Sequence, residues 1–272
     1  MGIVNVTPDS FSDGGRYLDP AAAIVHGLEL EAQGASILDI GGESTRPGAE
    51  PVSAEQERRR VLPVIEGLVA AGARAQISID TSKSAVASAA LAAGATLVND
   101  VSAFRADPEM AALVAASGAD CCLMHMRGEP RTMQRDPRYG DVVDDVKAFL
   151  ERRLALALDS GVAAERIMLD PGIGFGKTPA HNLELIGRLH ELAALGRTLL
   201  VGSSRKSFLG AVTARAVQGR LAGTIATNVL AYERGARVLR VHDVGPVYDA
   251  LAVTAATVTP RWAPTTPTSS TR

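Results

Sequence analysis

The chain of 272 residues lacks the features that mark several large classes of protein. Its net charge at neutral pH is only −2, which argues against a broad basic surface for nucleic acid or for an anionic membrane. No basic leader with a long apolar core opens the sequence, and Gly94 interrupts the longest nearly apolar stretch, residues 85–98. We therefore expect a cytoplasmic protein without nucleic-acid or membrane partners.

Cysteine is scarce, with only Cys121 and Cys122 present, and the two are adjacent in a strand-like run. Neighbouring residues on a strand face opposite sides, so these side chains are poorly placed to form a disulfide with each other. They are typical of small core residues in a reducing compartment.

Several familiar catalytic and cofactor motifs are also missing. We find no Ser-His-Asp or Cys-His arrangement for nucleophilic catalysis, and no His/Cys/Asp cluster for a dedicated transition-metal site. The glycines of Gly172-Ile-Gly-Phe-Gly176 lack the spacing and the strand-to-helix context of a dinucleotide-binding turn. The chemistry must therefore come from another arrangement of side chains.

What the sequence does contain is a regular alternation of eight short apolar runs with helix-like stretches. The runs are rich in Ile, Val and Leu, as buried parallel strands are. In a chain near the roughly 250 residues usual for the fold, this alternation predicts an α/β protein with a single (β/α)₈ TIM barrel. The expected strands are residues 2–6, 35–40, 76–80, 96–99, 120–124, 167–170, 198–202 and 237–241.

Short local signals mark the helix boundaries. Asp19-Pro20, Asp107-Pro108 and Thr178-Pro179 each pair a capping side chain with proline at the first helical position. The segment Ser53-Ala-Glu-Gln56 fits a capping box. Glycines follow the helix-like stretches, where helices end: Gly34, Gly72, Gly94, Gly118, Gly161, Gly196 and Gly235.

These signals also suggest how the chain is divided. The barrel should occupy residues 1–258, and the Pro/Thr/Ser-rich residues 259–272 should form a disordered tail. Two connections rich in glycine, proline and polar residues, 7–19 and 41–52, leave the carboxyl ends of strands. Long polar loops at that face of a barrel are usually functional, although flexible connectors would look the same.

Polar residues end most of the expected strands, which places the active site at the carboxyl-terminal face of the barrel. Asp80, Asn99 and Asp170 end strands three, four and six. Two carboxylates and an amide suit the donor-rich edge of a heterocycle such as an aminopyrimidinone ring. Each residue alone has a structural alternative, a side chain bonded to a neighbouring loop. We treat Asp39, which also ends a strand, as structural.

An anion site is expected where strands seven and eight end. Residues 202–207 lead into a helix start, whose backbone N–H groups and dipole favour negative charge, and Arg205 and Lys206 add cations. Arg240 and His242 lie two residues apart on the last strand, so both side chains should point the same way. A phosphate site recurs at this place in the fold. The alternative for Ser-Arg-Lys alone is a solvated helix start.

Asn5 ends the first strand, inside the expected mouth of the barrel. Its amide oxygen is a ligand of the kind that Mg²⁺ takes, and Mg²⁺ usually shares phosphate oxygens of a substrate. The alternative is an asparagine that only bonds backbone.

At these residues the sequence resembles the dihydropteroate synthase family, over nearly the whole chain from Met1 to about Val258. The motifs that carry the resemblance are Asn5-Val-Thr-Pro-Asp-Ser-Phe-Ser-Asp-Gly-Gly15, Gly41-Gly-Glu-Ser-Thr-Arg-Pro-Gly48, Ser78-Ile-Asp-Thr81, Asn99-Asp-Val101, Leu123-Met-His-Met126, Leu169-Asp-Pro-Gly-Ile-Gly-Phe-Gly-Lys177, Ser204-Arg-Lys-Ser207 and Arg240-Val-His-Asp-Val244. The resemblance implies a transferase of folate biosynthesis and a target of sulfonamides. Such an enzyme condenses 6-hydroxymethyl-7,8-dihydropterin diphosphate with 4-aminobenzoate to give 7,8-dihydropteroate and diphosphate.

The resemblance also implies roles for individual residues. Catalytic roles fall to Asn5, Lys206, Arg240 and His242. The pterin would be held by Asp80, Asn99, Asp170 and Lys206, with Met124, Phe175 and Arg240 lining its slot. The diphosphate would be bound by Asn5, Arg240 and His242, with Mg²⁺ near Asn5. The aminobenzoate site would be shaped by Phe11, Thr45, Arg46, Pro47 and Ser204. A homodimer is expected by analogy with the family.

Two other functions remain open at this point. A corrinoid-dependent methyltetrahydrofolate methyltransferase would share the carboxylates at the pterin edge, but it has no need for the diphosphate cluster. A non-catalytic pterin-binding paralogue should have lost loop or diphosphate residues, and none is lost in this sequence.

Overall fold

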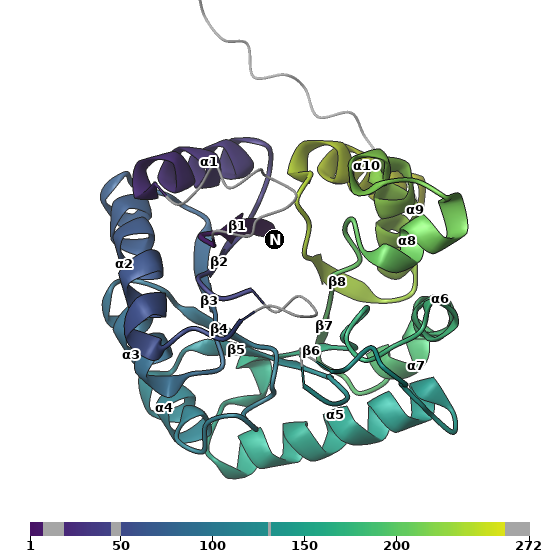
Figure 1. The fold of residues 1–272 in the computed structure, drawn as a ribbon, viewed down its shortest axis with the longest axis horizontal. Helices are drawn as coiled ribbons and strands as arrows, with labels where there is room; N and C mark the ends of the chain where they lie inside the picture. Colours follow the sequence, from purple (N-terminus) through teal and green to yellow (C-terminus); the bar gives the residue numbers. More distant parts are fainter. Residues whose placement is uncertain (8–18, 45–49, 130–131, 259–272) are drawn as a thin grey trace, which may run out of the picture.

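The computed structural model describes residues 1–7, 19–44, 50–129 and 132–258. Strands and helices alternate along the chain, and eight strands form one parallel sheet in sequential order from β1 to β8. Figure 1 shows the strands near the centre and the helices arranged as a ring around them. The predicted α/β fold with eight parallel strands is therefore confirmed.

The strands are β1 (Gly2–Asn5), β2 (Ile37–Gly41), β3 (Gln76–Asp80), β4 (Leu97–Asp100), β5 (Asp120–Met124), β6 (Ile167–Asp170), β7 (Thr198–Val201) and β8 (Ala236–Leu239). The helices are α1 (Pro20–Ala32), α2 (Ala54–Ala70), α3 (Ser84–Ala92), α4 (Met110–Ser117), α5 (Val142–Asp159), α6 (Pro179–Gly187), α7 (Leu189–Ala193), α8 (Ser207–Thr213), α9 (Leu221–Glu233) and α10 (Val244–Val258). Two short 3₁₀ turns, η1 (Ala164–Arg166) and η2 (Val217–Gly219), precede β6 and α9.

The two ends of the sheet meet at a narrow seam. The ordered ladders run from β1 to β8, and the seam carries one isolated parallel bridge between Gly2 and Val241. The backbone N–H of Ile3 donates to Val241 O at 3.1 Å, and the N–H of Val241 donates to Met1 O at 2.9 Å. The described sheet is thus a curled, open barrel, with a single bridge at the position where a closed barrel has a ladder.

Alternate residues on each strand face opposite layers of the core. Outward-facing residues such as Cys121 and Leu169 pack in the large cluster beneath the helices. Inward-facing residues form a second apolar cluster, built from Leu97, Cys122, Met168 and Leu200. The two free, buried cysteines belong to different clusters, as their adjacency on a strand predicts. The residues that follow the inner cluster by two positions face the carboxyl-terminal mouth.

Most of the predicted helix boundaries are confirmed. Asp19 and Thr178 cap α1 and α6 ahead of proline, and Ser53 and Gln56 form the capping box of α2. All seven glycines expected at helix ends have a positive φ. The prediction at Asp107 was wrong by two residues, because α4 begins at Met110. The Asp107 carboxylate instead accepts the N–H of Ser84 at 2.8 Å and that of Glu109 at 3.0 Å.

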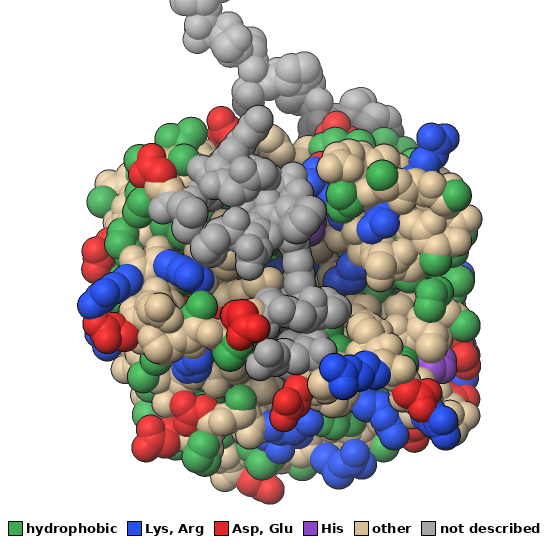
Figure 2. All heavy atoms as spheres, viewed as in Figure 1, with side chains coloured by type: hydrophobic (Ala, Val, Ile, Leu, Met, Phe, Trp, Pro, Cys, Tyr) green, Lys and Arg blue, Asp and Glu red, His purple; other side chains and the backbone are tan. Residues whose placement is uncertain are grey.

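The surface agrees with a small net charge. In Figure 2, Lys and Arg side chains are interspersed with Asp and Glu side chains on the face shown. Within the described ranges, no helix combines the length and the apolarity needed to cross a membrane. The expected tail, residues 259–272, lies outside the described residues.

Candidate active site

A small cavity of about 30 Å³ lies at the carboxyl ends of the strands. Its lining comes from six strands or the turns that follow them: Asp80, Asn99, Val101, Met124, Asp170, Phe175, Gly202, Lys206 and Arg240. The structure therefore brings together Asp80, Asn99, Met124, Asp170, Phe175, Lys206 and Arg240, all of which the sequence singled out. Val101 and Gly202 are additional lining residues. The convergence expected from the strand ends is confirmed.

Arg240 is the centre of a buried charge network. Its Nε donates to Asp39 Oδ2 at 2.6 Å, and its Nη2 donates to Asp80 Oδ2 at 2.8 Å. Asp39, which is fully buried, also accepts from Ser78 Oγ at 2.6 Å and from Asn99 Nδ2 at 3.1 Å. As we proposed, Asp39 has a structural role. That role serves the site, because the Asp39 carboxylate orients both Arg240 and Asn99.

Burial and ion pairing have opposite effects on the pKa of each group in this network. Burial raises the pKa of Asp80 to about 7, although the nearby Arg240 opposes the shift. Burial disfavours the charge on Arg240, but Asp39 and Asp80 outweigh it and raise the pKa of the guanidinium. Arg240 therefore stays charged, whereas Asp80 can exchange a proton near neutral pH. Such perturbed groups in a cavity are typical of functional sites.

Lys206 crosses the cavity from the turn after β7. Its Nζ donates to Ile173 O and lies 4.6 Å from the centroid of the Phe175 ring. Burial lowers the pKa of Lys206 to about 8, against the attraction of Asp170. Burial likewise raises the pKa of Asp170, whose Oδ1 accepts the N–H of Gly172 at 2.7 Å. The cavity thus pairs carboxylates with an ammonium that a ligand can compete for.

The turn between β6 and α6 closes one wall of the cavity. Gly172 and Gly176 both have positive φ, and a Cβ on Gly172 would lie 1.8 Å from His125 O, so only glycine permits this approach. Behind the wall, Lys177 Nζ lies 2.9 Å from His125 Nδ1 and donates to Phe175 O at 3.0 Å.

The pair behind this wall is deeply buried. Burial lowers the pKa of Lys177 well below its usual range, and burial with Lys177 lowers that of His125 to about 2. The hydrogen bond from Lys177 Nζ to Phe175 O fixes the backbone at Phe175, and the contact with His125 Nδ1 holds the lysine in place. Lys177 had no role among those predicted from the sequence. A lysine inside an otherwise apolar and glycine-rich motif was the available signal.

The predicted anion cluster is only partly assembled around the cavity. Ser204 Oγ lies 3.0 Å from His242 Nδ1 and accepts the N–H of His242 at 3.3 Å, so these two residues meet as expected. Arg205 differs from expectation, because it forms an ion pair with Asp243 and does not line the cavity. Arg240 also differs slightly, since β8 ends at Leu239 and Arg240 and His242 follow the strand.

Asn5 ends β1 close to Asp80. A Cβ placed on Gly41, between them, would lie 3.5 Å from Asn5 Oδ1 and 3.7 Å from Asp80 Oδ2, so both oxygens overhang the same glycine. Amide and carboxylate oxygens are the hard donors that Mg²⁺ prefers. Among the described residues, no group of three or more His, Cys, Asp and Glu side chains could cage a metal. The donor set therefore fits a Mg²⁺ that takes most of its ligands from a bound substrate.

Part of the predicted site falls outside the described residues. Phe11, Thr45, Arg46 and Pro47, which the resemblance places around aminobenzoate, all lie in residues 8–18 or 45–49. The sequence-based assignment of these four residues stays a prediction.

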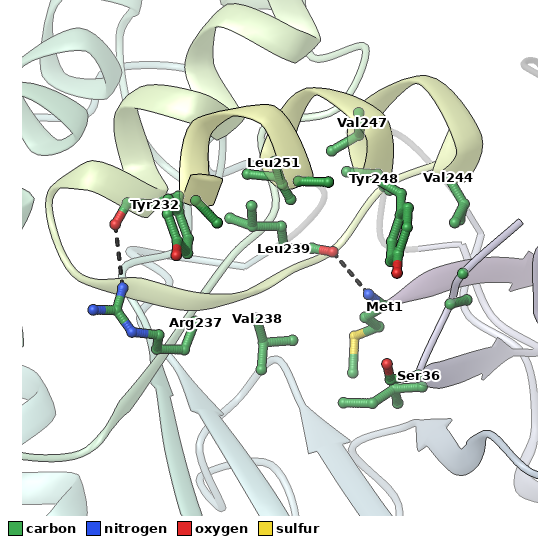
Figure 3. Close-up of a pocket in the computed structure, with 16 residues that line it drawn as sticks. Met1, Ser36, Tyr232, Arg237, Val238, Leu239, Val244, Val247, Tyr248 and Leu251 are labelled. Carbon is green, nitrogen blue, oxygen red and sulfur yellow. Dashed lines mark hydrogen bonds between the residues drawn. The ribbon is translucent and has the colours of Figure 1, made fainter. Parts of the chain in front are cut away.

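A second and larger cavity lies at the other end of the sheet. It has a volume of about 360 Å³ and is lined mainly by apolar side chains of β8 and α10 and by the residues that lead into β2. Figure 3 shows Val238 and Leu251 facing this space, with Arg237 bonded to Tyr232 O at its edge. None of the described residues that line it carries a carboxylate, so this lining offers little chemistry despite the size of the cavity.

Comparison with known proteins agrees with the geometry of the smaller cavity. Residues 1–242 match the family described as "Pterin binding enzyme". The chain is 43% identical to a dihydropteroate synthase of Escherichia coli K12 over 258 residues, covering 95% of this chain and 91% of that one.

The solved structures similar to this chain also include dihydropteroate synthases. A Yersinia pestis dihydropteroate synthase with a sulfonamide drug complex superposes with a TM-score of 0.91 at 43% identity, covering 94% of this chain and 93% of that chain. A Xanthomonas albilineans dihydropteroate synthase in complex with 7,8-dihydropteroate gives a TM-score of 0.85 at 46% identity, covering 96% and 94%. The chain therefore belongs to the family of pterin-binding enzymes that includes the dihydropteroate synthases.

Proposed function

We propose that this protein is a dihydropteroate synthase of folate biosynthesis. It joins the methylene carbon of 6-hydroxymethyl-7,8-dihydropterin diphosphate to the amine of 4-aminobenzoate. The observation that carries the proposal is the convergence of Asp80, Asn99, Asp170, Lys206 and Arg240 on one cavity at the carboxyl ends of the strands. The relatives described above, one with a sulfonamide and one with 7,8-dihydropteroate, support it.

The pterin ring enters the cavity by taking hydrogen bonds that the protein now makes internally. Asp170 and Asn99 present an acceptor and an amide to the ring edge, and Met124 and Phe175 contact its faces. Lys206 leaves Ile173 O and donates to the ring instead. Because these groups are buried, a ring without matching donors would leave them unpaired, and this favours the ring that matches them.

The diphosphate leaves as an anion when its C–O bond to the methylene carbon breaks. Oxygen keeps the electron pair, and His242, Ser204 and Arg240 stabilise the charge that develops on it. Asp39 and Asp80 hold the Arg240 guanidinium at the edge of the cavity, so its position is fixed before the substrate arrives. Asn5 would hold Mg²⁺, which supplies positive charge to the diphosphate oxygens when it is bound.

The amine of aminobenzoate then forms the new C–N bond and releases a proton to solvent. We place aminobenzoate beside Phe11, Thr45, Arg46, Pro47 and Ser204, as the family resemblance implies. An arylamine needs no strong base, so the residues contribute mainly by positioning, which can supply roughly 7–11 kcal/mol of the barrier. Exclusion of water from the cavity protects the reactive methylene.

Three further expectations are part of this proposal and rest on the family. They are full closure of the sheet into a (β/α)₈ barrel, a homodimer and a cytoplasmic location. The bridge between Gly2 and Val241 supports the first, and the two unbridged cysteines support the last.

Diphosphate release tests the proposal directly. Three reactions are run with protein and Mg²⁺. The first contains the pterin diphosphate alone, and the second contains the pterin diphosphate and 4-aminobenzoate. The third contains methyltetrahydrofolate and a corrinoid protein. With both of its substrates present, a synthase releases diphosphate and forms dihydropteroate in equal amount. Binding of the pterin without release would identify a non-catalytic paralogue, and methyl transfer to the corrinoid would identify the methyltransferase.

The anion site has its own test. Product diphosphate should bind tightly to the wild type and at least about tenfold more weakly to His242→Ala, since a charge-assisted hydrogen bond is lost. His190→Ala, which removes an exposed histidine from α7, is the matched control and should bind normally. Chelation of Mg²⁺ should weaken binding further in the wild type. Equal binding by His242→Ala would place the anion site elsewhere.

A further inference from the structure

Four consecutive carbonyl groups in the turn between β6 and α6 each accept a hydrogen bond from a different side chain. The donor and acceptor residues are Lys206 with Ile173, Gln134 with Gly174, Lys177 with Phe175 and Tyr139 with Gly176. Gln134 and Tyr139 belong to the connection between β5 and α5, and Lys206 to the turn after β7. The turn is therefore held largely by side chains from other parts of the chain.

The composition of this turn explains why it needs such bonds. Gly172, Gly174 and Gly176 alternate with Ile173 and Phe175, and all three glycines have a positive φ. Glycine adopts this conformation without steric strain, but it adopts many others as readily, so its own sequence does not fix the turn. Phe175 lies between two of the glycines and lines the cavity. The position of its ring therefore depends on the bonds that hold the neighbouring backbone.

Tyr139 is firmly seated for this task. Its hydroxyl donates to Gly176 O at 2.7 Å. Its ring meets the His181 ring edge-on, with centroids 4.9 Å apart, and the Arg127 guanidinium lies 4.9 Å from its centroid. His181 belongs to α6, the helix into which the turn leads. Burial raises the pKa of Tyr139 to about 12, so the hydroxyl keeps its proton and remains a donor at neutral pH.

We infer that Tyr139 is a positioning residue for the pterin and that it acts through Phe175. The inference rests on the proposed function, in which Lys206 leaves Ile173 O for the pterin ring and Phe175 contacts a face of that ring. Once Lys206 has moved, the turn keeps three of its four side-chain bonds, and the bond from Tyr139 fixes the carbonyl directly after Phe175. Displacements of about 1 Å in a binding site weaken it strongly, so this bond should affect affinity.

Tyr139→Phe removes the hydroxyl and keeps the ring. We expect the Kd of the pterin diphosphate with Mg²⁺ to rise about tenfold, the size of effect expected when one hydrogen bond is lost. KM for 4-aminobenzoate should stay within about twofold of wild type, and Tm should fall by about 2–4 °C. Tyr232→Phe is the matched control, because Tyr232 is also half-buried but lies on α9 and lines the cavity at the amino end. It should match wild type in all three quantities.

A double-mutant cycle with Phe175→Leu separates positioning from stability. In the Phe175→Leu background the ring that Tyr139 positions is absent, so Tyr139→Phe should raise the Kd by less than about twofold further. The decrease in Tm should be similar in both backgrounds, because the bond to Gly176 O is lost in each. Calorimetric titration and thermal unfolding of the four proteins measure these quantities.

Two outcomes overturn the inference without touching the proposed function. One is an unchanged Kd of the pterin diphosphate in Tyr139→Phe. The other is an equal rise of the Kd in both backgrounds, which would show that Tyr139 does not act through Phe175. A wild type that binds no pterin diphosphate would instead overturn the proposed function, and the inference with it.

Discussion

The two ends of the curled sheet hold cavities of opposite character. The cavity at the amino-terminal ends measures about 360 Å³ and has mainly apolar walls, whereas the one at the carboxyl ends measures about 30 Å³. The smaller cavity is lined by two carboxylates, an ammonium and a guanidinium. Burial of such groups opposes folding unless they are paired, so a protein keeps them where they are used. The convergence of charged side chains, more than the volume of the cavity, identifies the candidate active site.

The largest expected difference between the two ends concerns ligand affinity. We expect Asp170→Asn to weaken pterin binding on the order of 10⁴-fold, because an amide NH₂ would face the donors of the ring edge. Asp120→Asn, at the start of β5 on the opposite end, should leave affinity unchanged even though it disturbs a bond with Gln76. Calorimetry on the two folded variants makes the comparison. Unchanged affinity in Asp170→Asn would remove this residue from the pterin edge.

The next largest difference concerns stability. Arg240→Met leaves Asp39 and Asp80 buried without their cation, and removal of one partner from a buried pair costs roughly 3–5 kcal/mol. Arg237→Met, at an exposed position of β8 three residues before Arg240, should change the free energy of unfolding by less than about 0.5 kcal/mol. Urea denaturation of both variants tests this. Equal loss in the two would mean that the charge network contributes little.

The contrast also explains which features the sequence could predict. Strand positions came within one or two residues, because apolar runs and helix-ending glycines are local signals. Asp80, Asn99 and Asp170 were found because a parallel sheet brings strand ends together without any knowledge of packing. The error at Asp107 has a tertiary cause, since its carboxylate serves Ser84 on another helix.

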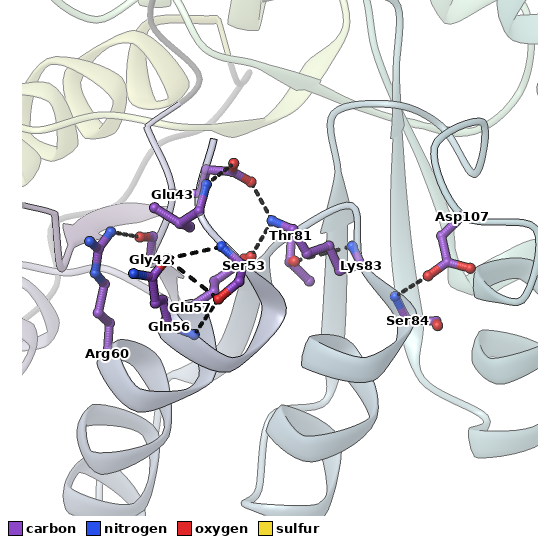
Figure 4. A network of polar contacts seen from close by, with 11 residues as sticks. Gly42, Glu43, Ser53, Gln56, Glu57, Arg60, Thr81, Lys83, Ser84 and Asp107 are labelled. Carbon is purple, nitrogen blue, oxygen red and sulfur yellow. Dashed lines mark hydrogen bonds and ion pairs between the residues drawn. The ribbon is translucent and has the colours of Figure 1, made fainter. Parts of the chain in front are cut away.

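Long-range pairing explains what the sequence could not supply. The role of Asp39 in orienting Arg240 joins residues 201 positions apart, and no local pattern encodes that contact. The ion pair of Arg205 with Asp243 removed a cation that a helix-start argument had assigned to the anion site. The ion pairs of Lys83 with Glu43 and Glu57 (Figure 4) were missed for the same reason. Charge pairs between elements become visible only when the elements are placed.

A smaller difference should be visible in the pH dependence of pterin binding. Lys206, with a pKa of about 8 lowered by burial, loses its charge as pH rises through 8 and then donates more weakly. Asp80, with a pKa of about 7 raised by burial, loses its charge as pH falls through 7 and then holds Arg240 less firmly. Affinity should therefore be greatest between pH 7 and pH 8 and fall by at most about tenfold per pH unit beyond each limit.

Calorimetric titration between pH 6 and pH 9.5 measures both limbs of this profile. Lys206→Arg keeps a positive charge above pH 8, so its pterin affinity should not decrease there, whatever its absolute value. Lys147→Arg, on α5 and away from the cavity lining, is the matched control and should still show the decrease in affinity above pH 8. A wild-type profile that stays flat from pH 7 to pH 9 would contradict the role of Lys206 charge in binding.

The smallest effect is expected from Val238→Ala, which lies on β8 two residues before Arg240 and faces the amino-end cavity. The change removes two methyl-sized groups from a half-buried side chain that packs against the inner cluster, so unfolding should require about 1 kcal/mol less. Affinity for the pterin should stay within about twofold of wild type, because Arg240, Asp39 and Asp80 are held in place by their own hydrogen bonds. Leu200→Ala, fully buried in the same cluster, should lose about 2–5 kcal/mol and shows that the measurement is sensitive. If Val238→Ala weakened pterin binding as much as it weakened the fold, the inner cluster would set the position of Arg240, and the two ends of the sheet would be coupled parts of one site.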